Sequence, residues 1–169
     1  QGYEVHYASM GEEEILDCDK SFVVPFTRSP FGLSNIAAYK QLKTIIDREH
    51  YDIIHTHTPM GSVVTRLAAR TARKKGTRVI YTAHGFHFFK GAPLLNWLIY
   101  YPVERYMARH TDTLITINRE DYGCAKKYFK TDVQYTPGIG VDMRRFQPAT
   151  KAAKSRLRAK HGYDEKDFI

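Results

Sequence analysis

The sequence predicts an α/β fold, a Rossmann-like parallel sheet with helices on both faces. Short runs of β-branched and aromatic residues alternate with longer runs that have helical periodicity. Strands that alternate with crossover helices are typical of a parallel sheet. Three of the short runs, IIHT, VIYTA and LITI, are nearly continuously apolar, which is usual for strands buried on both faces.

The expected elements follow one another in a regular order. Strands are expected over residues 4–9, 21–26, 51–56, 78–83, 113–117 and 133–136. Helices are expected over residues 34–49, 61–75, 93–110, 118–129 and 151–160. Ser34 and Asn118 are suited to cap the starts of two of these helices, and Gly76 is suited to end another.

Charge, apolar run length and cysteine content indicate what kind of partner and compartment the protein has. The 26 lysines and arginines exceed the 18 acidic residues and give a net charge of +8, which favours an anionic partner such as nucleic acid, a nucleotide phosphate or an acidic membrane. The longest uncharged stretch, residues 91–103, has 13 residues and is too short to span a bilayer, which takes about 20. Cys18 and Cys124 have no metal-ligand spacing and predict thiols in a reducing, cytoplasmic compartment.

Polar residues and glycines gather where the predicted strands end. Ligands of open parallel sheets bind at the carboxyl ends of the strands, so these residues form a candidate site. They are His57, Gly61, His84, Gly85, Phe86, His87, Asn118, Arg119, Gly138 and Gly140. His84 stands out because Gly85 beside it lets a ligand approach the backbone, and an imidazole there can bind phosphate or a sugar hydroxyl.

A zinc site is the alternative interpretation of these histidines. His55, His57, His84 and His87 fall at two strand ends, yet no carboxylate at ligand spacing completes the set and HExxH is absent. No metal is therefore predicted. GxGxxG, GxxxxGK[ST] and GxSxG are also absent, so nothing supports a P-loop nucleotide site or a hydrolase serine.

The stretch 85–106 is unusually aromatic, with Lys90 and Arg105 among the rings. One interpretation is a core-facing helix preceded by an aromatic loop. The other is a partly exposed, basic and aromatic surface that contacts a lipid interface, where Trp and Tyr are favoured.

Four motifs in register resemble the retaining glycosyltransferases of family 4, which have the GT-B fold. Residues 51–57 (YDIIHTH) resemble the strand with two histidines, and residues 81–85 (YTAHG) the next strand and loop. Residues 111–116 (TDTLIT) and 137–146 (PGIGVDMRRF) are similar to the following strand and to the closing segment of the N-terminal domain. Two further segments, residues 84–93 (HGFHFFKGAP) and 117–122 (INREDY), resemble those of the subgroup that builds capsular polysaccharides and exopolysaccharides.

The resemblance implies a domain organisation and an activity. Residues 1–146 would be the acceptor-binding domain, and residues 147–169 a linker and the start of a donor-binding domain. The family's first strand and donor domain fall outside this chain, so the chain alone is not expected to catalyse transfer. The family transfers sugar from a nucleotide-sugar substrate without cofactor or required metal, and the histidine matching His84 lines the cleft. We therefore expect a lipid-linked glycan acceptor and contact with the inner face of an anionic membrane.

Two alternatives remain open from the residues. The net charge of +8 also suits a basic α/β module that binds nucleic acid, whose affinity would fall steeply with salt. An epimerase of the same fold acting on UDP-sugars would keep the sheet but need carboxylates placed to remove a sugar proton.

Overall fold

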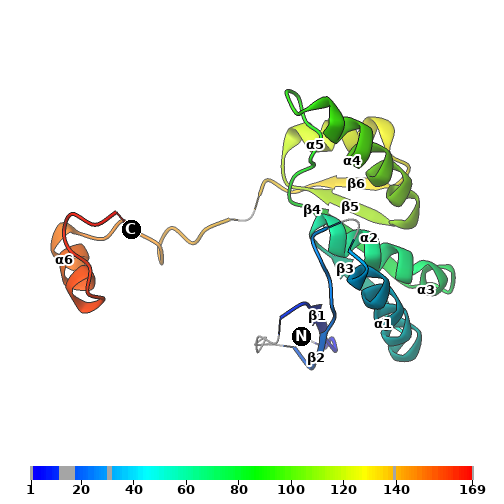
Figure 1. The fold of residues 1–169 in the computed structure, drawn as a ribbon, viewed down its shortest axis with the longest axis horizontal. Coiled ribbons are helices and arrows are strands. Elements are labelled where there is room, and N and C mark those ends of the chain that lie inside the picture. Colours follow the sequence, from blue (N-terminus) through cyan, green and yellow to red (C-terminus); the bar gives the residue numbers. More distant parts are fainter. Residues whose placement is uncertain (1, 12–17, 30–31, 139, 169) are drawn as a thin grey trace. The chain divides into compact units, whose positions relative to one another are not determined.

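A computed structural model describes residues 2–11, 18–29, 32–138 and 140–168. Its main sheet has four parallel strands in the order β3-β4-β5-β6 (Figure 1). The strands are β3 (Ile53–Thr56), β4 (Arg78–Ala83), β5 (Thr113–Thr116) and β6 (Asp132–Tyr135). Their connections contain α2 (Pro59–Ala68), α3 (Arg70–Lys74), α4 (Leu94–Met107) with a 3₁₀ turn (Ala108–His110), and α5 (Arg119–Tyr128). The predicted parallel α/β class is confirmed.

One face of this sheet is buried more completely than the other. Ile54, Val79, Tyr81, Leu114 and Val133 are buried, whereas the alternate positions of β3 are exposed and those of β5 are half-buried. Successive parallel strands added in one direction by right-handed crossovers receive their helices on one side. The most deeply buried side chains of the four neighbouring strands therefore lie on the same face of the sheet.

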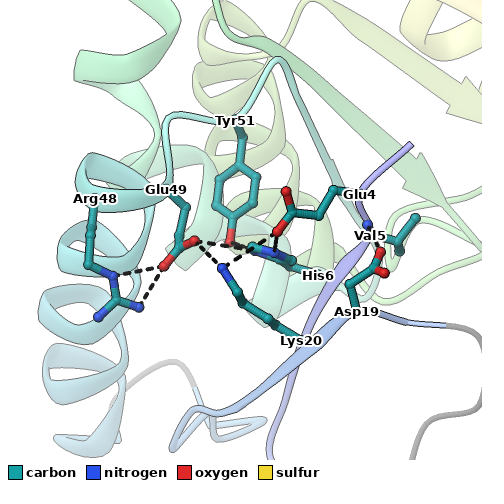
Figure 2. A network of polar contacts seen from close by, with 8 residues as sticks. All are labelled: Glu4, Val5, His6, Asp19, Lys20, Arg48, Glu49 and Tyr51. Atoms are coloured by element: carbon teal, nitrogen blue, oxygen red, sulfur yellow. Dashed lines mark hydrogen bonds and ion pairs between the residues drawn. The ribbon is translucent and has the colours of Figure 1, made fainter. Parts of the chain in front are cut away.

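Two further strands form a separate parallel sheet. They are β1 (His6–Ser9) and β2 (Lys20–Val23), and the chain then enters α1 (Ser34–Glu49). Polar contacts join β1 and β2 to the end of α1 (Figure 2): His6 Nδ1 lies 2.7 Å from the Tyr51 hydroxyl, and Lys20 Nζ lies 3.0 Å from Glu49 Oε2. Val24, after β2, packs with Leu42 and Ile46 of α1 in an apolar cluster.

The observed helix boundaries and caps agree with the predicted ones at some positions and differ at others. The bounds of α1 are as predicted, but Leu33 occupies its N-cap position and no side chain caps it. Asn118 does cap α5, since its side chain accepts a hydrogen bond from the Asp121 N–H. The helix expected over residues 61–75 starts earlier and is interrupted at Ala69.

A buried ion pair joins α2 to α4. Arg66 is 1% exposed, and its Nη2 lies 3.0 Å from Glu104 Oε2. Arg66 also donates to the Ser62 carbonyl at 3.1 Å, and its guanidinium lies 4.3 Å from the centre of the Tyr81 ring. These partners satisfy a cation that would otherwise be very unfavourable in the core. The ion pair, with the Tyr81 ring beside it, thus holds α2 and α4 against the same strand, β4.

Residues 139–169 form a compact unit of their own, distinct from residues 1–138. In this unit α6 (Lys151–Lys160) is capped by Thr150, whose hydroxyl accepts from the Ala153 N–H at 3.2 Å. Asp142 closes a turn by accepting from the Arg144 N–H at 2.9 Å. The division lies nearer the N-terminus than the predicted boundary at residue 146, which remains a prediction.

Candidate functional site

Two histidines meet where β3 and β4 end. His57 follows β3 directly and His84 follows β4 directly, and both side chains are exposed. His57 Nδ1 lies 3.1 Å from His84 Nε2, within hydrogen-bond distance. Parallel pairing in register brings the two strand ends together. The structure thus places two of the predicted site residues in direct contact.

His55 extends this pair to a row of three rings. The centroids of the His55 and His57 rings are 4.4 Å apart, and those of His57 and His84 are 5.4 Å apart. His55 Nε2 lies 2.8 Å from Thr82 Oγ1. Partial desolvation of the rings by their neighbours, and then the neighbouring histidine charges, lower the pKa values of His55 and His57 below the usual range. Near neutral pH both rings are therefore uncharged, and His57 can serve as a hydrogen-bond acceptor.

The loop after His84 is held by two carboxylates in the first turn of α5. Asp121 Oδ2 accepts from the backbone N–H of Phe86 at 2.9 Å and from Asn118 Nδ2 at 2.8 Å. Glu120 Oε1 accepts from the Lys90 N–H at 2.5 Å. Asp121 is 3% exposed, so its charge has little access to solvent. The sequence places Asp121 in the first turn of this helix, as observed, but does not indicate that Asp121 and Glu120 hold the loop, because first-turn carboxylates are common on helices without any such contact.

The predicted residues of this loop have different surroundings. Gly85 has φ of 151°, which favours glycine. Phe86 is buried, and its ring stacks on Phe88 at 4.7 Å, so it is part of the core. His87 is exposed, with its ring stacked on Tyr100 at 4.5 Å. Of the predicted site residues in this loop, Gly85, through its backbone, and His87, through its side chain, are open to a ligand.

The remaining predicted residues lie at neighbouring strand ends. Asn118, whose side chain caps α5, is half-buried, whereas Arg119, the first residue of α5, is exposed. Gly61 lies in the first turn of α2, and a Cβ there would come 2.8 Å from Thr58 Oγ1. Gly138 follows β6 with φ of 75°.

Gly140 belongs to the unit formed by residues 139–169. Ile139, between the two glycines of the predicted turn, lies outside the described residues. The role of this turn in ligand binding stays a prediction.

Two other features bear on what the site can bind. Among the described residues, no group of three or more His, Cys, Asp or Glu side chains is arranged to hold a metal ion. A hollow of about 270 Å³ opens elsewhere, between the ends of α1 and α3, and is lined by residues that include Asp47, Tyr51 and Lys75. It lies at the amino ends of β3 and β4. The histidine row is preferred as the site because it combines reactive groups with the strand ends where ligands bind.

No helix in the described ranges of the chain has the length and apolar character needed to cross a bilayer.

Several known proteins are similar in sequence to this chain. A protein of Bacillus subtilis (strain 168) that bears the name "Putative glycosyltransferase EpsD" is 53% identical over 170 residues, covering 99% of this chain and 45% of EpsD. UDP-Gal:alpha-D-GlcNAc-diphosphoundecaprenol alpha-1,3-galactosyltransferase of Escherichia coli is 33% identical over 123 residues, which cover 68% of this chain and 31% of the enzyme. An uncharacterized 41.2 kDa protein in the cps region of Klebsiella pneumoniae is 30% identical over 103 residues, covering 59% of this chain and 29% of that protein.

The chain thus spans less than half the length of these relatives. A family profile described as glycosyl transferase 4-like matches residues 1–118, which include β1 to β5 and the whole histidine row. With the parallel α/β fold and the histidines at its strand ends, this match shows that the chain belongs to the glycosyl transferase 4-like family.

Proposed function

We propose that this chain is the acceptor-side part of a retaining glycosyltransferase of polysaccharide biosynthesis. The enzyme transfers a sugar from a nucleotide-sugar donor to a lipid-linked glycan. The observation that carries the proposal is the contact between His57 and His84, 3.1 Å apart at the carboxyl ends of two parallel strands. Family membership supports the reaction class, and the name of the Escherichia coli relative supports a diphosphate-linked lipid as the acceptor.

In this proposal His84 stabilises charge that develops during transfer. The bond from the sugar C1 to the phosphate oxygen breaks, and a bond from C1 to the acceptor oxygen forms on the same face. The acceptor hydroxyl proton leaves with the departing phosphate. Preorganised donors that face such developing charge are worth a large share of an enzyme's rate enhancement.

His57 prepares His84 for that role. The lowered pKa of His57 keeps its ring neutral near pH 7. We assign it the tautomer whose Nδ1 carries no proton, so that this atom accepts the Nε2–H of His84 across 3.1 Å. His84 Nδ1 is then the nitrogen that can face the substrate, and it can donate when the ring is protonated. His57 is thus a positioning residue and His84 the group that contacts the sugar or its phosphate.

Exposed groups around the pair are suited to the rest of the substrate. Arg119 presents a guanidinium at the start of α5, and the Gly85 backbone has no side chain in the way. We propose that these two, with His87, contact phosphate or sugar hydroxyls. The donor enters as a substrate, and no bound cofactor takes part. The reaction takes place in the cytoplasm, at the inner face of the membrane that carries the acceptor.

The two alternative functions have weaker support. The nucleic-acid hypothesis rests on the net charge of +8, and the relatives described above include no nucleic-acid-binding protein by name. An epimerase needs a carboxylate at the site as a base, whereas Asp121, the buried carboxylate there, is engaged by Phe86 and Asn118.

The test is a transfer assay with the full-length protein. Purified enzyme is incubated with labelled UDP-sugars and a polyprenyl-diphosphate-linked sugar, and the product is analysed by mass spectrometry and NMR. A lipid-linked product with the donor's anomeric configuration supports the proposal. Release of an epimerised UDP-sugar without transfer, or inversion at the anomeric carbon, contradicts it. The same assay after metal chelation tests whether a metal is needed.

A further inference from the structure

Thr58, which lies between His57 and the first residue of α2, has an unusual backbone conformation. Its φ is 59° and its ψ is 141°. Residues other than glycine seldom have positive φ, and for a β-branched residue such as threonine it is a genuine outlier. His50, the other described non-glycine residue with positive φ, has a ψ of 54° and so lies in the small left-handed region that other residues can adopt. Thr58 lies outside that region, so its backbone is strained.

The local sequence accounts for only part of this conformation. The ring of Pro59 restricts the residue before it to extended ψ values, which explains the ψ of Thr58 but not its φ. A threonine at the N-cap of a helix normally has an extended backbone and accepts a hydrogen bond from the first turn, whereas the side chain of Thr58 makes no such bond. The strain is therefore maintained by the surrounding structure.

The first turn of α2 holds Thr58 from one side. The carbonyl oxygen of Thr58 accepts a hydrogen bond from the Ser62 N–H at 3.0 Å. Ser62 is buried, and Arg66 donates to its carbonyl at 3.1 Å and to its hydroxyl at 2.9 Å. Arg66 is in turn paired with Glu104 in the core. Gly61 leaves room for the Thr58 side chain, since a Cβ there would come 2.8 Å from Thr58 Oγ1. The start of α2 is thus anchored to the core.

His57, on the other side of Thr58, is placed by the sheet. It follows Thr56, the last residue of β3, which pairs in register with Tyr81 of β4. His57 Nδ1 lies 3.1 Å from His84 Nε2. Relief of the strain needs a rotation about the N–Cα bond of Thr58. Because α2 is anchored, this rotation would move the peptide before Thr58, and His57 with it.

We propose that Thr58 is a positioning residue whose strained backbone holds His57 against His84. Strained residues cluster at active sites, where the surrounding structure offsets their cost and the strain keeps a group in its working position. The effect on catalysis rests on the proposed function, whereas the effect on the position of His57 does not depend on which reaction takes place.

Thr58→Gly in the full-length protein removes the strain, because glycine adopts positive φ readily. The unfolding temperature should rise, since the relief of strain exceeds the effect of the extra freedom that glycine gives the unfolded chain. The kcat for transfer should nevertheless fall about tenfold, because displacing an orienting group by about 1 Å can lower a rate by up to about 10²-fold. The KM values should change little, since the contact acts in the transition state. A purely structural role would not lower kcat while stability rises.

Two variants serve as matched controls. Thr58→Val keeps a β-branched residue and the strain but removes the hydroxyl, so its kcat should stay close to that of the wild type. His50→Gly also relieves a positive φ, before the amino end of β3, and should raise the unfolding temperature without changing kcat. An equal fall of kcat in Thr58→Val and Thr58→Gly would mean that the hydroxyl is the active group, and the proposal would be wrong. A fall of kcat in His50→Gly as large as that in Thr58→Gly would also overturn it.

A double variant tests whether Thr58 acts through His57. Thr58→Gly should lower kcat in the wild-type background but not further in His57→Ala, because a residue that acts through another loses its effect when the other is removed. Additive losses of kcat would overturn the proposal.

An NMR titration separates this proposal from the proposed function. The pKa of His57 is lowered by partial desolvation and then by the charge of His84, so a ring that moves away from His84 should have a pKa closer to about 6.5. In histidine-labelled full-length protein, this pKa should rise in Thr58→Gly but not in Thr58→Val. An unchanged pKa in Thr58→Gly overturns the positioning role even if sugar transfer is observed. A rise of this pKa in Thr58→Gly, in a protein whose wild type transfers no sugar, would contradict the proposed function alone.

Discussion

The Asp121 carboxylate accepts a hydrogen bond from the backbone N–H of Phe86 at 2.9 Å, across 35 positions of the sequence. Phe86 follows Gly85 and His84, so this bond determines where the backbone leaves the end of β4. The same carboxylate accepts from Asn118, which caps α5. The position of His84 therefore depends on the start of α5, and His57 contacts it from the other side.

Loss of the Asp121 carboxylate should loosen this loop. Asp121→Ala leaves the buried Phe86 N–H without its partner, which costs about 1–3 kcal/mol of folding free energy. We expect a lower unfolding temperature, a lower kcat for transfer and faster amide exchange at Phe86. Asp121→Asn keeps an oxygen acceptor and should recover part of each effect. If Asp121→Ala leaves Phe86 exchange unchanged, the carboxylate does not hold the loop.

A pair of glycine substitutions tests the backbone at Gly85. Gly85 has φ of 151°, so Gly85→Ala is strained although a Cβ would have no atom within 4 Å. Such strain costs about 1–3 kcal/mol. Gly123→Ala, in α5 and also with no atom within 4 Å, should instead stabilise by about 1 kcal/mol. Equal shifts of the unfolding temperature in the two variants would contradict this.

Replacing Arg66 or Glu104 alone should lower the free energy of unfolding more than replacing both residues together. Glu104→Gln or Arg66→Met alone leaves a buried partner unpaired and should cost about 3–5 kcal/mol of unfolding free energy. Arg66→Met/Glu104→Leu removes both charges and should cost much less. Denaturant unfolding of the three variants measures this. A double variant as unstable as the sum of the single ones would show that the two side chains are not coupled.

The histidine row should make the fold sensitive to acid. The pKa of His55 is lowered by burial, so the unfolded chain binds this proton more readily than the folded one. In the unfolded chain the pKa of this histidine is about 6.5. The contribution of neutral His55 to folding stability is complete above that pH, and it is lost as the pH falls through the lower pKa of the folded state. Unfolding temperatures measured between neutral and mildly acidic pH should fall less steeply in His55→Gln. An unchanged slope would contradict the assignment.

Local patterns predicted much of this fold. The bounds of α1, β4 and α6 agree with the expected ranges, and Asn118 caps α5 as expected. Such signals lie within a few residues of the feature that they predict. The proximity of His57 and His84 could also be predicted from the sequence, since parallel strands bring their carboxyl ends to one edge of the sheet.

Features that depend on distant residues could not be inferred from local patterns. Arg66 and Glu104 are 38 positions apart, and nothing near either one distinguishes it from a surface charge on a helix. Phe86 was expected to contact substrate, but its ring joins an aromatic core that also contains Phe129. In the aromatic stretch, Trp97, Tyr100 and Tyr101 of α4 pack against the core while its leucines are exposed. Contact of this stretch with a lipid interface stays a prediction.

The most direct test of the central claim is the kcat of sugar transfer in single-histidine variants of the full-length protein. Removing a preorganised group that contacts developing charge lowers kcat by about 10²–10³-fold, and we expect this for His84→Ala. His57→Ala should have a smaller effect, and His161→Ala, in the other unit, should have none. Wild-type kcat in His84→Ala, with lipid-linked product still formed, would contradict the role assigned to the histidine pair.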